Sequence, residues 1–232
     1  MKTSVPIVDV IIPAFNEQES IGMVIAGIDK QLVREIVVAD NNSTDQTSVN
    51  ATNAGATVLL EKRKGYGAAC LKGMSYLQNK SVPPDIVIFI DGDYSDFPEE
   101  MSQLIEPIVK NDIDFVIGSR ALGNRERGAM QPQQVFGNWL ATRLLYLFYG
   151  VRFTDLGPFR AIKWEELQSL GMVDKNYGWT VEMQLKAAKN KLICTEIPVS
   201  YRRRIGISKV SGTVKGTILA GYKIITTIFK YL

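Results

Sequence analysis

The chain has 232 residues, 46% of them hydrophobic and 22% charged, a composition typical of a globular protein and not of a disordered one. Its net charge of +3 is too small to indicate a nucleic-acid-binding protein. Histidine is absent, which excludes the commonest zinc ligand and the usual general base at neutral pH, so a bound metal is expected to be Mg²⁺ or Mn²⁺ on oxygen ligands.

The first half of the chain alternates short apolar runs with helical patterns, which predicts an α/β fold with a doubly wound, mostly parallel sheet and helices on both faces. The expected strands are residues 7–12, 35–39, 57–60, 85–90 and 114–118. The expected helices are residues 17–30, 44–54 and 67–78, with another after residue 98. The second half predicts helices at 134–150 and 179–189, strands at 159–163 and 192–197, a basic loop at 201–209 and a last helix from about 213 to 232.

Polar side chains follow several of the predicted strands, at the edge of the sheet where ligands bind in such folds. They are Asn16, Glu17, Asp40, Asn41, Asn42, Asp91, Asp93, Ser119 and Arg120. Their convergence on one edge predicts a binding site there.

The segment Asp91-Gly92-Asp93, which follows the apolar run 86–90, is the main candidate for a metal site. Two carboxylates two residues apart can hold a hard cation that also binds a diphosphate, and the glycine lets the backbone bend close to the ligand. The alternative is an acidic turn, but the apolar strand before it and Asp40 at the end of a sister strand favour the metal site. Asp40 itself can accept hydrogen bonds from a base or a ribose, or it can cap the next helix.

Glycines and arginines indicate candidate anion sites. The segment Lys64-Gly65-Tyr66-Gly67 precedes a helix and suits an anion at the helix N-terminus, or close packing of backbone against a ligand. Arginine forks bind phosphate, and they gather in two loops, so two phosphate-binding loops are predicted, with a solvated basic face as the alternative. The loop residues are Arg120, Arg125 and Arg127 in one, and Arg202, Arg203, Arg204 and Lys209 in the other.

The segments IIPAFNE, VVADNNSTDQT, KGYGAA, DGDYSDFPEE and GSR follow one another in this order. Together they resemble the glycosyltransferases of family 2, which have the GT-A fold, and the resemblance covers nearly the whole chain. It implies a nucleotide diphosphate sugar (a UDP- or GDP-sugar) as donor, a metal on Asp91 and Asp93, and a transfer that inverts the anomeric centre. The donor-binding residues expected from these motifs are Pro13, Phe15, Glu17, Asp40, Lys64, Gly67, Asp91, Gly92 and Asp93.

The segments TDLGPFR, YGWTVEMQLKAA and YRRRIGISKVSG resemble the branch of that family that transfers sugars to dolichyl and polyprenyl phosphates. The resemblance implies that Asp155 and Glu182 face the acceptor, and with Asp93 they are the candidate catalytic residues. The residues expected to bind the acceptor phosphate are Arg120, Arg125, Arg203, Ser208 and Lys209. A growing glycan or a small phosphorylated metabolite is the alternative acceptor, and Glu182 or Asp155 would then have to act as a base. A nucleotide-sugar-binding protein without activity is the remaining alternative, which the intact Asp91 and Asp93 disfavour.

The last predicted helix has Lys215, Lys223 and Lys230 as its charges, and at ~100° per residue they lie within roughly an 80° arc. Such a basic stripe on an apolar helix is typical of a helix in a membrane interface, and the predicted helix at 134–150 carries one charge, Arg143. A core helix or a dimer contact is the alternative.

A single domain over residues 1–232 is expected, with a nucleotide-sugar half at 1–120, an acceptor half at 121–212 and an amphipathic helix at 213–232. The start of the chain lacks a signal-peptide pattern, and Cys70 and Cys194 are expected to be free thiols. The protein is therefore expected in the cytoplasm, peripheral on the inner face of the cell membrane.

Overall fold

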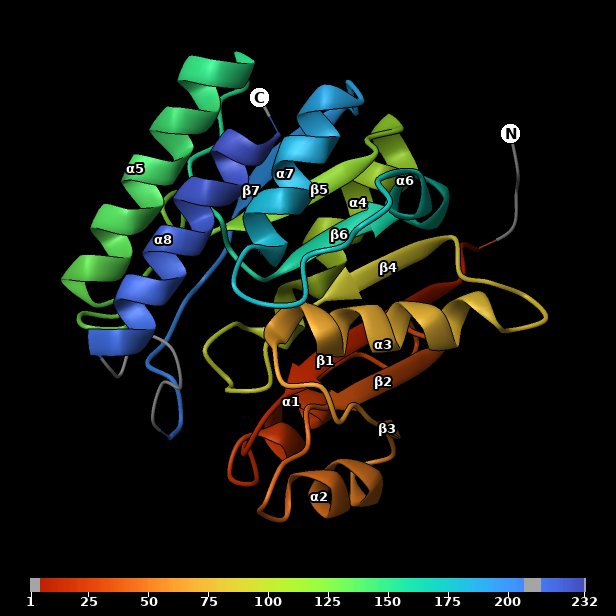
Figure 1. Ribbon diagram of the computed structural model, residues 1–232. Coiled ribbons are helices and arrows are strands. Elements are labelled where there is room, and N and C mark those ends of the chain that lie inside the picture. Colours follow the sequence, from red (N-terminus) through yellow and green to blue (C-terminus); the bar gives the residue numbers. More distant parts are fainter. Residues whose placement is uncertain (1–4, 207–213, 232) are drawn as a thin grey trace.

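The computed structural model describes residues 5–206 and 214–231, and these contain one seven-stranded sheet in the order β3-β2-β1-β4-β6-β5-β7 (Figure 1). Every neighbouring pair of strands is parallel except the two pairs that β6 makes. The predicted doubly wound, mostly parallel sheet is therefore confirmed. The strands are β1 (Val8–Ala14), β2 (Glu35–Asp40), β3 (Thr57–Leu60), β4 (Ile86–Phe89), β5 (Phe115–Ser119), β6 (Arg160–Lys163) and β7 (Cys194–Pro198).

Both faces of the sheet are covered by helices, with an apolar core on each side. Successive residues of a strand point to opposite faces, so Val10 and Ile12 of β1 join one core and Ile11 joins the other. This double coverage explains why the central strand β4 is a continuous apolar run. The first core is completed by α1 (Ile21–Gly27), α2 (Thr47–Asn53) and α4 (Met101–Asn111). The second is completed by α3 (Tyr66–Gln78), α5 (Pro132–Tyr149), α6 (Trp164–Ser169), α7 (Trp179–Lys189) and α8 (Val214–Lys230).

Some elements differ from the predicted ones in their bounds or direction. Helix α1 begins at Ile21 and not at residue 17, because Asn16 has a left-handed backbone and the chain turns before the helix. A 3₁₀ turn (Pro98–Glu100) precedes α4, and α6 was not predicted because six residues are too few to show a helical period. Strand β6 enters the sheet antiparallel between β4 and β5, so β5 is not the neighbour of β4.

Helix α8 lies beside α5 and packs against α7 (Figure 1). Its Ile228 is fully buried, and the carbonyl of Ile228 accepts a hydrogen bond of 2.8 Å from the Tyr149 hydroxyl of α5. Lys223 forms an ion pair of 2.9 Å with Asp174. These contacts place one side of α8 in the core, which was the alternative to a helix that lies in a membrane interface. In the described part of the chain, no helix is both long and apolar enough to cross a bilayer.

Candidate active site

Strands β1, β2 and β4 end at the same edge of the sheet, and a cavity of about 300 Å³ opens there. Its walls come from the ends of these strands, from the start of α3 and from two later loops. We call it the first cavity, and it is lined by Pro13, Ala14, Phe15, Glu17, Asn41, Lys64, Gly65, Tyr66, Ala69, Asp91, Gly92, Asp93, Tyr177 and Arg204.

Asp91 and Asp93 lie side by side in the first cavity, directly after β4. Asp91 Oδ1 accepts a hydrogen bond of 3.0 Å from the Tyr66 hydroxyl, while Asp93 Oδ1 accepts one of 2.9 Å from the backbone N–H of Ser95. Burial raises the pKa of the Asp91 carboxyl to about 6, and the negative charge of Asp93 adds to this shift. The two neighbouring carboxylates repel each other, and a bound cation would relieve this repulsion.

The chemistry of these two carboxylates fits Mg²⁺ or Mn²⁺, which prefer oxygen ligands. Within the described residues, no group of three or more His, Cys, Asp or Glu side chains gathers to hold a metal ion. A cation at Asp91 and Asp93 would therefore need further oxygen ligands, and the phosphates of a bound ligand can supply them. The site suits a metal that binds together with a diphosphate rather than alone.

The structure places several residues predicted for the donor around the first cavity. Pro13, Phe15 and Glu17 line it, and the Lys64 ammonium lies 5.5 Å from the centre of the Phe15 ring. Asp40 is buried outside the lining, and its carboxylate accepts hydrogen bonds from the Ser43 N–H and the Ser48 hydroxyl.

Asn41, the next residue after Asp40, lines the cavity instead. Its amide nitrogen donates to the carbonyls of Glu61 and Arg63, and its amide oxygen accepts the N–H of Gly65 at 2.7 Å. Asn41 thus fixes the segment between β3 and α3 that forms one wall. Its place directly after a strand was the only sequence signal for this residue.

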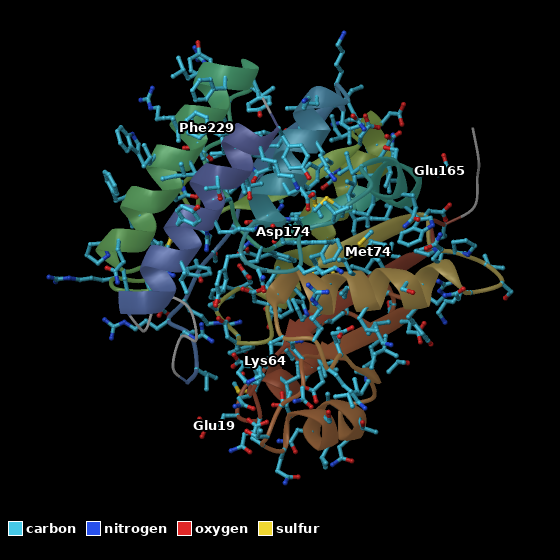
Figure 2. The ribbon with its side chains drawn as sticks, viewed as in Figure 1. Glu19, Lys64, Met74, Glu165, Asp174 and Phe229 are labelled. Atoms are coloured by element: carbon cyan, nitrogen blue, oxygen red, sulfur yellow. The ribbon has the colours of Figure 1, made fainter. Side chains whose placement is uncertain are left out.

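The glycines before α3 pack against the chain's own backbone. A Cβ at Gly67 would lie 2.1 Å from the carbonyl oxygen of Asp174, and one at Gly65 would lie 2.0 Å from that of Lys175. The N–H of Ala68 donates to the Lys175 carbonyl at 3.0 Å. Figure 2 shows Asp174 beside α8 and Lys64 at the lower edge of the sheet. The tight space at Gly67 is therefore filled by the loop before α7 and not by a ligand, which corrects the sequence-based interpretation.

Asp155 and Glu182, the two candidate bases, line neither the first cavity nor the second one described below. The buried Asp155 carboxylate binds Arg120 through both oxygens, with distances of 2.7 and 2.8 Å. The buried Glu182 carboxylate accepts the Asp174 N–H at 2.8 Å and the Tyr231 hydroxyl at 2.6 Å. Glu182 thus ties the loop before α7 to the end of α8.

A second cavity of about 320 Å³ lies between the carboxylates and the helix pair α5 and α8. Arg120, with its guanidinium 5.0 Å from the centre of the Tyr201 ring, forms part of its wall. From α5 come Gln133, Gln134, Gly137 and Asn138, and from α8 come Gly221 and Ile224. The residues that line both cavities are Tyr66, Asp91, Asp93, Tyr177 and Arg204. The two cavities therefore meet at the paired carboxylates.

The two arginine-rich loops lie together. The N–H of Tyr201 donates to the Asn124 carbonyl at 2.8 Å, and the Arg203 guanidinium donates to the Arg127 carbonyl at 2.7 and 2.9 Å. Arg125 and Arg203 are exposed and line neither cavity, whereas Arg120 lines the second and Arg204 lines both. The predicted phosphate ligands Ser208 and Lys209 lie outside the described residues.

Comparisons with known proteins show the family and the fold. The family described as "Glycosyl transferase family 2" matches residues 9–170. An uncharacterized glycosyltransferase of Mycobacterium tuberculosis is 34% identical over 217 residues, which cover 92% of this chain and 94% of the relative. The undecaprenyl-phosphate mannosyltransferase of Micrococcus luteus is 27% identical over 218 residues, 89% of this chain and 88% of the relative. Among solved structures, glucosyl-3-phosphoglycerate synthase from M. tuberculosis has a TM-score of 0.77 and 23% identity, and the match covers 97% of this chain and 80% of that chain.

Proposed function

The chain belongs to glycosyl transferase family 2, and we propose that it transfers a hexose from a nucleotide diphosphate sugar to the phosphate of a polyprenyl or dolichyl lipid. The observation that carries this proposal is the meeting of two cavities at one pair of carboxylates. A donor in the first cavity and an acceptor in the second would approach each other at Asp91 and Asp93. An inactive nucleotide-sugar-binding protein would need only the first cavity.

The first cavity supports a donor with a diphosphate. Pro13 and Phe15 give it an apolar wall suited to a nucleoside, and Lys64 and Arg204 bring positive charge. When bound to Asp91 and Asp93, Mg²⁺ or Mn²⁺ would neutralise charge on the leaving nucleoside diphosphate. The Mn²⁺ and UDP in crystals of the glucosyl-3-phosphoglycerate synthase are in keeping with this proposal.

The second cavity supports a phosphate acceptor that arrives from the helices α5 and α8. An acceptor phosphate oxygen is anionic near neutral pH, so it can attack the anomeric carbon without losing a proton to the protein. A carbon–oxygen bond forms to the acceptor as the bond to the diphosphate breaks, with inversion at that carbon. This suits a chain without histidine in which Asp155 and Glu182 are held in other bonds. The undecaprenyl-phosphate acceptor in the name of the M. luteus relative supports the lipid class.

The outer face of α5 supports contact with a membrane surface. Phe136, Trp139 and Leu147 are 61%, 52% and 71% exposed, and the exposed Arg143 lies between them. At ~100° per residue these four side chains lie within roughly an 80° arc. Neither α5 nor α8 contains an acidic residue, so the pair suits anionic lipid headgroups. We infer a cytoplasmic protein that is peripheral on the inner face of the cell membrane.

The proposal is tested by a donor screen followed by a transfer assay. UDP- and GDP-sugars with Mn²⁺ are screened first by thermal shift, because a bound ligand raises the melting temperature. The donor that binds is then offered undecaprenyl phosphate, dolichyl phosphate or 3-phosphoglycerate, the last being the acceptor class of the structural neighbour. Glycolipid formation is the expected result. Transfer to 3-phosphoglycerate alone would replace the lipid with a small phosphorylated acceptor, and donor binding without any transfer or donor hydrolysis would indicate an inactive protein.

Asp155 and Glu182 are expected to stabilise the fold and not to act as catalytic bases. Asp155→Asn removes the charge that faces Arg120 and should lower the free energy of unfolding by about 3–5 kcal/mol, as breaking a buried ion pair does. Glu182→Gln weakens the hydrogen bonds that Glu182 accepts from the Asp174 N–H and the Tyr231 hydroxyl, and it should lower the free energy of unfolding by about 1–3 kcal/mol. Transfer per folded molecule should fall by less than the ~10²–10⁴ typical of a lost general base. Urea unfolding and initial rates check this, and a larger loss that more basic pH restores would favour a hydroxyl acceptor.

A further inference from the structure

Arg204 bridges two carboxylates that line the first cavity. One of its terminal nitrogens lies 2.9 Å from Glu17 Oε1, beside the apolar wall of the first cavity, and the other lies 3.2 Å from Asp93 Oδ2. The guanidinium lines both cavities. A single side chain therefore contacts the proposed metal ligand, the donor cavity and the acceptor cavity.

The backbone on either side of Arg204 is fixed. The N–H of Arg202 donates to the Ser95 carbonyl at 2.9 Å, and that of Ile205 donates to the Asp93 carbonyl at 3.0 Å. The Arg202 guanidinium packs between two aromatic rings, 3.5 Å from the centre of Tyr94 and 3.8 Å from that of Phe97. Because the chain is held here, Arg204 reaches Asp93 from a defined direction.

The two oxygens of Asp93 have different partners. Oδ1 accepts hydrogen bonds from the N–H and the hydroxyl of Ser95, whereas Oδ2 faces Arg204. A divalent cation that binds Asp93 through Oδ2 would meet the positive charge of Arg204 at the same oxygen. Two cations on one oxygen repel each other, so binding of one weakens binding of the other.

Arg204 also retains an unused donor. Its Nε is buried and, among the described residues, has no hydrogen-bond acceptor. A buried N–H without an acceptor destabilises the protein, so a ligand that supplies an acceptor is favoured. Phosphate oxygens are strong acceptors for an arginine fork.

We propose that Arg204 makes the binding of the divalent cation and of the donor diphosphate cooperative. Arg204 opposes the cation at Asp93 Oδ2 until a diphosphate accepts its guanidinium, and the diphosphate then supplies both a partner for Arg204 and oxygens for the cation. The inference rests on the proposed function in one respect, that Asp91 and Asp93 hold the cation. Linkage makes the effect reciprocal, so the cation strengthens diphosphate binding by the same factor.

The test measures Mn²⁺ binding by electron paramagnetic resonance of the free ion, without nucleotide and with saturating UDP or GDP, whichever raises the melting temperature. A titration without protein corrects for Mn²⁺ that the nucleotide binds by itself. In Arg204→Gln, the affinity for Mn²⁺ alone should rise about tenfold because a neighbouring positive charge is gone. The factor by which the nucleotide enhances Mn²⁺ binding should shrink about tenfold in this variant, and the enhancement that remains comes from the phosphate oxygens on the cation. Arg204→Lys keeps the charge and should keep the weak binding of Mn²⁺ alone.

Lys110→Gln is the matched control, since it removes one positive charge from the exposed face of α4 and should leave both affinities unchanged. Melting temperatures establish that each variant is folded. An unchanged or lower Mn²⁺ affinity in folded Arg204→Gln would overturn the inference and leave the metal site standing. A wild-type protein that binds no Mn²⁺ in either condition would overturn the metal site and the inference together.

Discussion

Replacing Asp93 with asparagine should abolish hexose transfer while the protein stays folded. The side chain keeps its shape and can still accept the Ser95 N–H, so little packing is lost. The charge that would hold the cation disappears, and with it the stabilisation of the leaving diphosphate, which is worth several kcal/mol. A rate loss of at least ~10³ is expected, since 1.36 kcal/mol corresponds to a factor of ten. Initial rates of glycolipid formation and thermal melting measure the two effects.

Asp112→Asn is the control for this change, because Asp112 is exposed, lies after α4 and tolerates asparagine at its left-handed backbone. It should transfer hexose at the wild-type rate. An excess of EDTA should abolish hexose transfer by the wild-type protein, and added Mn²⁺ should restore the transfer. Full activity of Asp93→Asn, or of the wild-type protein in EDTA, would refute the metal-dependent mechanism.

The sequence predicts the sheet and the location of the site because both depend on local patterns. Buried strands such as 86–90 are continuous apolar runs, and the polar residues that follow them meet at one edge once the strands are parallel. Asp91 and Asp93 could be placed at that edge without knowing any contact. Phe15 and Lys64, which line the first cavity, were indicated by the family motifs and not by the strand pattern.

Contacts between distant segments could not be read from the sequence. The pairing of Asp155 with Arg120 depends on β6 entering the sheet antiparallel beside β5, and no local pattern gives that order. The close approach at Gly67 depends on the loop before α7, more than a hundred residues later in the chain. The role of a glycine or a buried carboxylate depends on which distant residues contact it. The sequence therefore indicated the chemistry of these residues but not their partners.

For helix α8, too, the sequence could not show which side of the helix is exposed. Its lysine pattern predicts an amphipathic helix, but the direction in which that helix faces depends on α5 and α7. Ile228 is buried, while Phe229 remains 51% exposed, and its ring centre lies 5.4 Å from that of Phe148 on α5. Figure 2 shows Phe229 on α8. The proposed membrane surface therefore lies on the outer sides of both helices, and its exposed large side chains include Leu147 of α5 and Tyr222 of α8, at 71% and 69%.

Replacing Phe136, Trp139 and Leu147 together with serine should release the protein from liposomes that contain anionic lipid. Full burial of each such side chain is worth about 1.5–3 kcal/mol, and partial burial of all three predicts a loss of about 100-fold in the partition coefficient. Stability should change little, because these side chains are exposed in the folded protein. Arg143→Gln should weaken the free energy of liposome binding by a further ~1 kcal/mol at low salt. The effect should be smaller at high salt, where the attraction to headgroups is screened. Sedimentation with liposomes across a salt series measures both terms.

The matched control replaces Leu60, Val82 and Val109 with serine, because these side chains are exposed to 51%, 55% and 54% but lie away from α5 and α8. It should bind liposomes as the wild-type protein does. Transfer to a full-length polyprenyl phosphate in liposomes should fall in the α5 variant and hold in the control, whereas transfer to a short, water-soluble prenyl phosphate should hold in both. Equal liposome binding by the two triple variants would mean that α5 is not the membrane surface. Wild-type protein that ignores liposomes at every salt concentration would remove the physical support for a lipid acceptor, and a soluble phosphorylated acceptor would then be the better assignment.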